Sequence, residues 1–145
     1  MTVEPYSDKY FGDILKIVEN FHKEAVCEYG ESFDVEVLAE TIRNADTQNA
    51  FLMIVDGSCQ GLIYGSRWQS PMSGKVIFQE TIWYVNESFR RYGISLLREV
   101  EKLLKSQGVN IMIMAVLENS KTEKIKTFYE RLGFKPMETH YMRSL

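Results

Sequence analysis

The sequence predicts an α/β fold in which a mixed, mostly antiparallel central sheet is flanked by about four helices. Three observations lead to this prediction: two segments with helical apolar spacing at the start, three β-rich segments in the middle, and an alternation of helix, strand and helix afterwards. The chain has 145 residues, which suits one domain with its own buried core. We therefore expect residues 1–145 to form a single domain.

The first part of the chain has the pattern of two helices. Apolar residues between Tyr10 and Ala25 recur at steps of three and four, which places them on one helical face. The same spacing predicts a second, shorter helix from about Asp34 to Ala45. The residues between the two helices are expected to form a loop.

The middle of the chain predicts three strands, over residues 50–56, 62–68 and 75–85, because these segments are rich in β-branched and aromatic residues. Residues 57–61 and the Pro- and Gly-containing residues 70–74 are expected to be the turns that join them. Three strands joined by turns in this way form an antiparallel meander.

Helix and strand alternate in the next part of the chain. Residues 93–106 have apolar side chains at helical spacing, and Gly108 follows where a helix C-terminal glycine is common. Residues 110–117 are almost continuously apolar, which is typical of a strand that is buried on both faces.

The C-terminal part predicts one more helix and two short strands. The order Ser-Lys-Thr-Glu at residues 120–123 fits a capping box, so a helix is expected to begin there and to end at Gly133. Residues 134–137 and 140–145 are expected to be short terminal strands.

Composition excludes several kinds of protein. Lys and Arg number 17 against 20 Asp and Glu, a net charge of −3, which disfavours bulk attraction to nucleic acid. Two cysteines without a CxxC spacing and only two histidines support neither a metal site nor a disulfide framework. The chain also lacks an apolar run of membrane-spanning length and a secretory signal pattern. We expect a cytoplasmic protein with no metal, no membrane and no nucleic-acid partner, the weaker alternative being a nucleic-acid surface of Arg90, Arg91, Lys121, Lys124 and Lys126.

The most informative segment is the junction between the third strand and the next helix, residues 85–95 (VNESFRRYGIS). The N-terminus of a helix offers backbone N–H groups and the positive end of a dipole, which favour a phosphate. Gly93 is expected to let the backbone turn and approach a ligand closely, and Ser95 is small enough not to block it. Arg90 and Arg91 add positive charge at the same place. The simpler interpretation is an ordinary strand-to-helix turn that carries arginines.

This segment resembles the acyl-CoA-binding motif of the GNAT N-acetyltransferase superfamily, Arg/Gln-x-x-Gly-x-Gly/Ala, with Arg90, Gly93 and Ser95 at the signature positions. Serine in place of glycine or alanine is a departure, although a small one. A second element, residues 128–134 (FYERLGF), resembles the Tyr-x-x-x-Gly-Phe of the family. The order of predicted elements fits over nearly the whole chain. The resemblance implies a GNAT fold and a transfer of an acetyl group from acetyl-CoA to a primary amine, without a metal.

The resemblance also suggests which side chains carry out the chemistry. Tyr129 matches the family tyrosine that protonates the departing thiolate; otherwise it is a packing residue of its helix. Glu80 is the best candidate for the general base, because a carboxylate is costly inside an otherwise apolar strand and related enzymes often have a glutamate there. Otherwise Glu80 is an exposed or ion-paired strand residue. Strict alternation would put Phe78, Glu80, Ile82 and Tyr84 on one face, unless a bulge shifts the count.

Contacts with the coenzyme are implied at two places. The backbone of residues 83–85 would hold the pantetheine arm, and residues 90–95 the pyrophosphate. The asparagine common in the family before its tyrosine is absent, since Thr122 stands there, and Asn119 is the nearest substitute. The coenzyme-binding residues implied are Trp83, Tyr84, Val85, Arg90, Arg91, Tyr92, Gly93, Ile94, Ser95 and Asn119.

The acceptor is left open between a small-molecule amine and a protein or peptide amine. Residues 22–34 and the loop at 69–74 would shape its pocket, and the acidic residues in the first of these would attract a cationic amine or form a solvated face. An alternative is a catalytically inactive module of the same fold that binds CoA or another protein. Terminal strands of this fold often pair two copies, so a homodimer is one arrangement that the resemblance allows.

Overall fold

The computed structural model describes residues 1–26, 32–45, 47–117, 121–143 and 145. It contains two compact units, Met1–Ala115 and Val116–Leu145, and each is described by itself. No helix among these residues has both the length and the apolar character to cross a membrane.

The first unit is built on a five-stranded sheet in the order β1-β2-β3-β4-β5. Four strands, β1 (Thr2–Pro5), β2 (Ala50–Val55), β3 (Ser58–Gln69) and β4 (Val76–Val85), pair antiparallel with their neighbours. The edge strand β5 (Ile111–Ile113) runs parallel to β4. The mixed, mostly antiparallel sheet predicted from the sequence is therefore confirmed.

The turn between β2 and β3 is shorter than predicted. Asp56 and Gly57 both have positive φ, 51° and 80°, which is the backbone of a two-residue hairpin turn. β3 consequently begins at Ser58, so the expected turn over residues 57–61 is wrong. Periodicity could not reveal this, because the first residues of β3 are polar or small.

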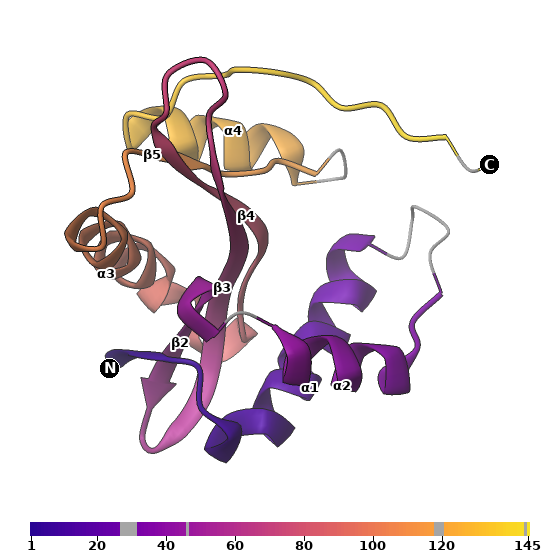
Figure 1. Cartoon of the computed structure of the whole chain (residues 1–145). Helices are drawn as coiled ribbons and strands as arrows, with labels where there is room; N and C mark the ends of the chain where they lie inside the picture. The colour runs from indigo at the N-terminus through magenta and orange to yellow at the C-terminus, as the bar shows by residue number, and fades with distance from the viewer. Residues whose placement is uncertain (27–31, 46, 118–120, 144) are drawn as a thin grey trace. The chain divides into compact units, whose positions relative to one another are not determined.

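Helices cover both faces of this sheet (Figure 1). The helix α1 (Phe11–Phe21) follows a 3-10 turn, η1 (Asp8–Tyr10), and continues into a π-helical turn, η2 (His22–Val26). The helix α2 (Val35–Asn44) is capped by Asp34, whose carboxylate accepts from the N–H groups of Glu36 and Val37 at 2.9 and 3.1 Å. Both helices lie on one side of the sheet, to its right in Figure 1.

The opposite face is covered by α3 (Gly93–Ser106), which follows a second 3-10 turn, η5 (Glu87–Tyr92). A further 3-10 turn, η4 (Thr47–Asn49), precedes β2. The helix α3 spans the predicted residues, and Gly108 beyond its end has a φ of +83°, the left-handed conformation that closes helices. Its buried residues are Gly93, Leu96, Leu97, Val100 and Leu104.

The predicted strand over residues 110–117 is mostly wrong. Only Ile111–Ile113 pair with β4, and Ile111 is 38% exposed while Met112 and Ile113 are half-buried. An apolar run indicates burial of side chains, but a strand also needs a partner backbone along its length. Here β4 supplies that partner over three residues only.

The second unit contains α4 (Thr122–Arg131). Its N-cap is Lys121, not Ser120, and the hydroxyl of Thr122 donates to the carbonyl of Leu117 at 2.9 Å. The capping-box prediction is therefore wrong in register, and Ser120 lies outside the described residues. Gly133 ends the helix as predicted, with a φ of +89°. The described residues after Gly133 form no strand, which contradicts the two predicted terminal strands over these positions.

Candidate functional site

An extra residue in β4 changes which side chains face which helices. Tyr64 pairs with Ile82 and Gly65 with Glu80, so Thr81 is bulged out of the ladder. Tyr84 packs edge-on against Phe21 of α1, with ring centroids 6.4 Å apart, so beyond the bulge Ile82 and Tyr84 face α1. Strict alternation, which would put Phe78, Glu80, Ile82 and Tyr84 on one face, therefore does not hold, and the bulge named as the alternative does.

Before the bulge, β4 presents its side chains to the other face. Phe78 packs against Phe51 of β2 with centroids 6.0 Å apart, on the side of the sheet that α3 covers. Gly65 leaves the room that this arrangement needs, because a Cβ there would lie 2.2 Å from the carbonyl oxygen of Gln79 and 2.7 Å from the Phe78 ring. Glu80 lies directly opposite Gly65 and therefore shares that face.

Glu80 is a buried carboxyl group at the point where two strands separate. The pairing of β5 with β4 ends at Gln79, and β4 continues to Val85. The Glu80 side chain, 7% exposed, accepts a hydrogen bond from the N–H of Ala115 at 2.9 Å, across this opening. Burial raises the pKa of Glu80 to about 7, against the opposing effect of the Ala115 hydrogen bond. A carboxyl with such a pKa can take up or release a proton near neutral pH.

The junction between β4 and α3 is a helical turn rather than an open loop. Residues of η5 lead directly into α3, and the N–H of Gly93 donates to the carbonyl of Arg90. Gly93 has ordinary helical angles, φ −56° and ψ −42°, and a Cβ there would lie 3.8 Å from Trp83 and 4.0 Å from Val85. The backbone conformation thus does not require glycine, so the predicted turn at Gly93 is wrong, whereas the close approach of a ligand there stays a prediction. Ile94 and Ser95 are exposed on the first turn of α3.

The two arginines of this junction have different surroundings. The guanidinium of Arg90 is 2.6 Å from the carboxylate of Glu24, in η2. The other oxygen of Glu24 accepts from the Tyr84 hydroxyl at 2.5 Å. The pKa of Tyr84 is raised to about 12, mainly by burial and secondly by this hydrogen bond to Glu24. Arg91, by contrast, stacks over the ring of Tyr92, 4.7 Å from its centroid.

The remaining predicted site residues are those of the β4 end, Tyr129 and Asn119. Trp83 is half-buried and Tyr84 and Val85 are buried in β4, as expected of side chains whose backbone alone was implicated. Tyr129 belongs to the second unit, where it is 7% exposed and packs between Phe128 and Phe134, at centroid distances of 6.0 and 5.4 Å. Asn119 lies outside the described residues.

Sequence reasoning missed the part that Glu24 plays. It grouped Glu24 with Glu28, Glu31 and Asp34 as carboxylates that would attract a cationic amine or form a solvated face. Glu24 instead bonds to Tyr84 and Arg90, and Asp34 caps α2; Glu28 and Glu31 lie outside the described residues. No local signal could have found the Glu24 contacts, because its partners are 60 and 66 positions away.

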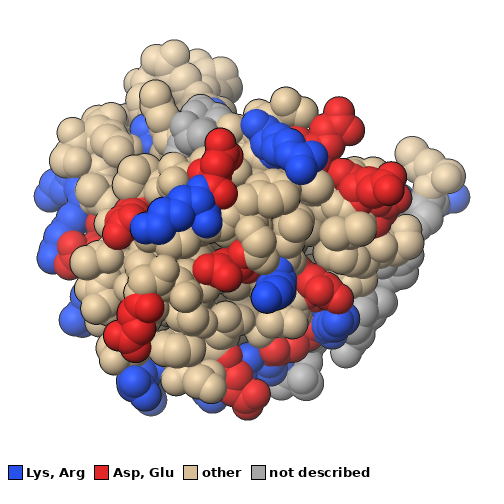
Figure 2. Space-filling view, turned by 90° about the horizontal axis from the view of Figure 1, so that it is seen from below, with Lys and Arg blue, Asp and Glu red and all other residues tan. Residues whose placement is uncertain are grey.

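The surface charges are mixed in sign. On the face shown in Figure 2, basic and acidic side chains alternate without gathering into a patch of one sign. No group of three or more His, Cys, Asp or Glu residues that could hold a metal ion occurs within the described ranges. The face in Figure 2 does not present the basic surface that the nucleic-acid alternative needs.

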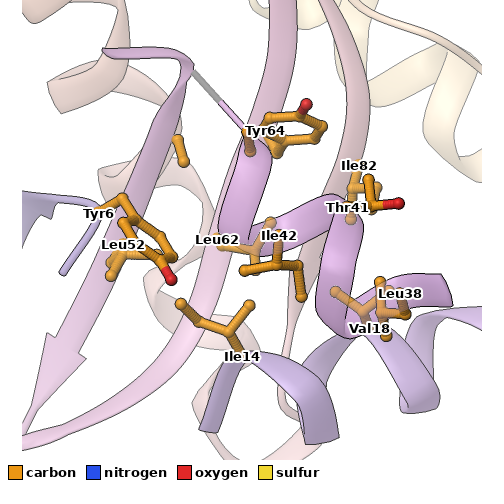
Figure 3. Close-up of a pocket in the computed structure, with 12 residues that line it drawn as sticks. Tyr6, Ile14, Val18, Leu38, Thr41, Ile42, Leu52, Leu62, Tyr64 and Ile82 are labelled. Carbon is orange, nitrogen blue, oxygen red and sulfur yellow. The ribbon is translucent and has the colours of Figure 1, made fainter. Parts of the chain in front are cut away.

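A small apolar cavity of about 70 Å³ lies between α1, α2 and the sheet (Figure 3). The side chains around it are nearly all hydrocarbon, contributed by Tyr6, Ile14, Val18, Leu38, Thr41, Ile42, Ala45, Ala50, Leu52, Leu62, Tyr64 and Ile82. The cavity lies on the face opposite to α3.

No protein-family model and no curated protein matches the chain, but solved structures match along nearly all of it. A possible acetyltransferase from Clostridium difficile 630 is 17% identical, with a TM-score of 0.79, over 99% of this chain and 96% of that one. A ribosomal-protein-alanine N-acetyltransferase from Brucella melitensis biovar Abortus 2308 is 13% identical, with a TM-score of 0.78, over 100% of both chains. The chain has the GNAT fold. An aminoglycoside acetyltransferase from an uncultured soil metagenomic sample also matches, at 14% identity and a TM-score of 0.73, over 99% of this chain and 97% of that one. At these identities the likeness concerns the GNAT fold alone.

Proposed function

We propose that this protein is an N-acetyltransferase that transfers an acetyl group from acetyl-CoA to a primary amine by direct attack in a ternary complex. The observation that carries the proposal is Glu80, a buried carboxyl with a pKa near 7 at the opening between β4 and β5 of a GNAT fold. A carboxylate held out of water near its pKa is suited to accept a proton from an amine at neutral pH.

The coenzyme has a compatible site along β4. Beyond Gln79, one backbone edge of β4 has no strand beside it in the described part of the chain, so its amides and carbonyls can bind the pantetheine arm. The junction at residues 90–95 follows directly and carries two arginines, which suits the pyrophosphate. We assign coenzyme binding to the backbone of Trp83–Val85 and to residues 90–95, with Asn119 as a further candidate. The proposal requires no metal.

In the proposed reaction Glu80, directly or through water, removes a proton from the ammonium form of the acceptor. The free amine then attacks the thioester carbonyl, its nitrogen releases a second proton to solvent, and the carbon–sulfur bond breaks to give the amide and the thiolate. Tyr129 donates its proton to the departing thiolate and recovers one from solvent. A phenol with an ordinary pKa near 10 is protonated at neutral pH and can donate to a thiolate of pKa about 8.5.

The acceptor is proposed at the level of its reacting group, a primary amine. Structures of the same fold are described as acting on aminoglycosides and on the alanine of a ribosomal protein, so small-molecule and protein amines are both reasonable. The alternative is an inactive module of this fold. It predicts binding of CoA without turnover.

The test is thiol release from acetyl-CoA with a panel of aminoglycosides, amino acids and peptide N-termini, after calorimetry has established that acetyl-CoA binds. We expect the kcat/KM of the wild type to rise as the pH increases through about 7. Glu80→Gln should lack this rise and should lower kcat by about 10²–10⁴-fold. Tyr129→Phe should lower kcat while coenzyme binding persists. A wild-type protein that does not bind acetyl-CoA would refute the proposal, and binding without turnover would favour the inactive module.

A further inference from the structure

The adjacent arginines Arg90 and Arg91, in the turn η5 before α3, have different side-chain partners. Arg90 is paired with the carboxylate of Glu24 at 2.6 Å, and the second oxygen of that carboxylate is held by the Tyr84 hydroxyl at 2.5 Å. Both Glu24 oxygens therefore have partners, and the network joins η2, β4 and η5. Arg91 has no carboxylate partner among the described residues and lies over Tyr92.

The Glu24 network also fixes the direction of the Arg90 side chain. Tyr84 belongs to the core cluster beneath α1, together with Ile17 and Val18. Gly93, the first residue of α3, lies beside Trp83 and Val85, because a Cβ added there would be 3.8 and 4.0 Å from their side chains. These two side chains point to the other face of β4, since side chains alternate along a strand. The bond to Glu24 therefore draws the guanidinium of Arg90 to the α1 side, away from the face on which α3 begins.

A phosphate would meet different costs at the two arginines. To bind the Arg90 nitrogen that Glu24 holds, the phosphate must displace the carboxylate, which then loses its bond to this cation. Arg91 is exposed, and within the described part of the chain its contacts are with the ring and hydroxyl of Tyr92. Its charge is available to a phosphate without breaking an ion pair.

We propose a narrower assignment within residues 90–95: the Arg91 side chain binds the coenzyme phosphates, whereas the Arg90 side chain does not, and Arg90 is instead a positioning residue that Glu24 holds against Tyr84. Glu24 lies in η2 (His22–Val26), a described part of the segment that we expect to shape the acceptor pocket. The Glu24–Arg90 pair thus fixes the acceptor side of the site to the junction that binds the coenzyme. This inference rests on the proposed function.

The experiment measures the Kd for CoA by calorimetry, and the KM for an active amine, in four variants. We expect Arg91→Gln to weaken CoA binding about tenfold or more, the effect of losing a charged hydrogen bond, and to leave the amine KM unchanged. Arg90→Gln and Glu24→Gln should leave the CoA Kd unchanged and raise the amine KM about two- to fivefold, as a half-exposed ion pair allows. The swap Glu24→Arg with Arg90→Glu should restore the amine KM.

A matched control is Lys102→Gln, which breaks the Lys102–Glu99 ion pair, also 2.6 Å long and exposed, within α3. It should change neither constant. The inference is overturned if Arg90→Gln weakens CoA binding as much as Arg91→Gln does, or if Glu24→Gln tightens it, since Glu24 would then only compete with phosphate. Failure of the wild type to bind CoA would instead count against the proposed function, so the two failures are distinguishable.

Discussion

The two faces of the sheet differ in how closely their helices pack. On one face α3 buries Leu96, Leu97, Val100 and Leu104, each between 0 and 2% exposed. On the other face α1 buries Ile14, Ile17 and Val18, but none of the residues of α2 is buried. The helix α2 covers instead the cavity of about 70 Å³, and it exposes Val35 and Val37 to solvent.

This difference matches the two tasks that an acetyl transfer sets. A coenzyme common to many enzymes needs a fixed site, and the junction that we assign to it leads into the tightly packed α3. The segment that we propose to shape the acceptor pocket adjoins α2, which has no buried residue, and we propose that the acceptor reaches Glu80 at the opening between β4 and β5. Elements with few buried contacts open locally at low cost in free energy and can adapt their shape.

The largest effect expected from this comparison is on stability. Leu97→Ala, on the tightly packed face, should lower the free energy of unfolding by about 2–5 kcal/mol, since it removes buried methyl groups and leaves a cavity. Leu38→Ala, in α2, should cost about 1 kcal/mol or less, because Leu38 is half-buried and already borders a cavity. Urea denaturation measures both. Equal losses would show that α2 is as firmly packed as α3.

Parts of the fold follow from local patterns and parts do not. The spacing of apolar residues predicts α3 correctly, because one face of that helix is buried along its whole length. The apolar residues 110–117 indicate a strand, yet only three of them pair, since pairing depends on a partner distant in sequence. The same is true of the Thr81 bulge, which separates Glu80 and Ile82 onto opposite faces.

The candidate site shows the same limit. A carboxylate inside an apolar strand marks Glu80 by itself, and its burial and raised pKa follow from that position. The spacing of Arg90, Gly93 and Ser95 marks the junction before α3. It gives no sign that Arg90 is bound by Glu24, because that contact forms only when α1 packs on the sheet. Motifs thus mark the candidate site, and tertiary contacts decide which way its side chains point.

The next prediction concerns the ionisation of Glu80 on the α3 side of the sheet. Its pKa in the folded protein, about 7, lies above the ordinary 4.5. The stability contributed by the protonated form is therefore fully present below pH 4.5 and is lost as the pH rises through 7, by about 3 kcal/mol in total. Glu80→Gln stays neutral and can still accept from Ala115. We expect it to match the wild type at pH 4 and to be about 3 kcal/mol more stable at pH 8.

Thermal and urea unfolding at both pH values measure this effect, and the control is Glu87→Gln, an exposed glutamate of η5. If Glu80→Gln loses as much stability as the wild type between pH 4 and pH 8, Glu80 is not the group that titrates. A gain in stability at pH 8 accompanied by a loss of turnover would show that the carboxyl is kept at this position for its chemistry, at a cost to the fold.

The smallest predicted change in the free energy of unfolding has opposite signs on the two faces of the sheet. Val18 in α1 borders the cavity and Val100 in α3 is fully buried, with exposed fractions of 8% and 0%. Replacing either by isoleucine adds one methylene. Val18→Ile should extend into the cavity and raise the free energy of unfolding by about 0.8 kcal/mol, whereas Val100→Ile has no space to enter and should lower it by about 1–3 kcal/mol. Urea denaturation of the two variants measures this difference. A loss of stability in both variants would mean that the space beneath α2 is too narrow for a methylene. The two faces of the sheet would then be packed alike.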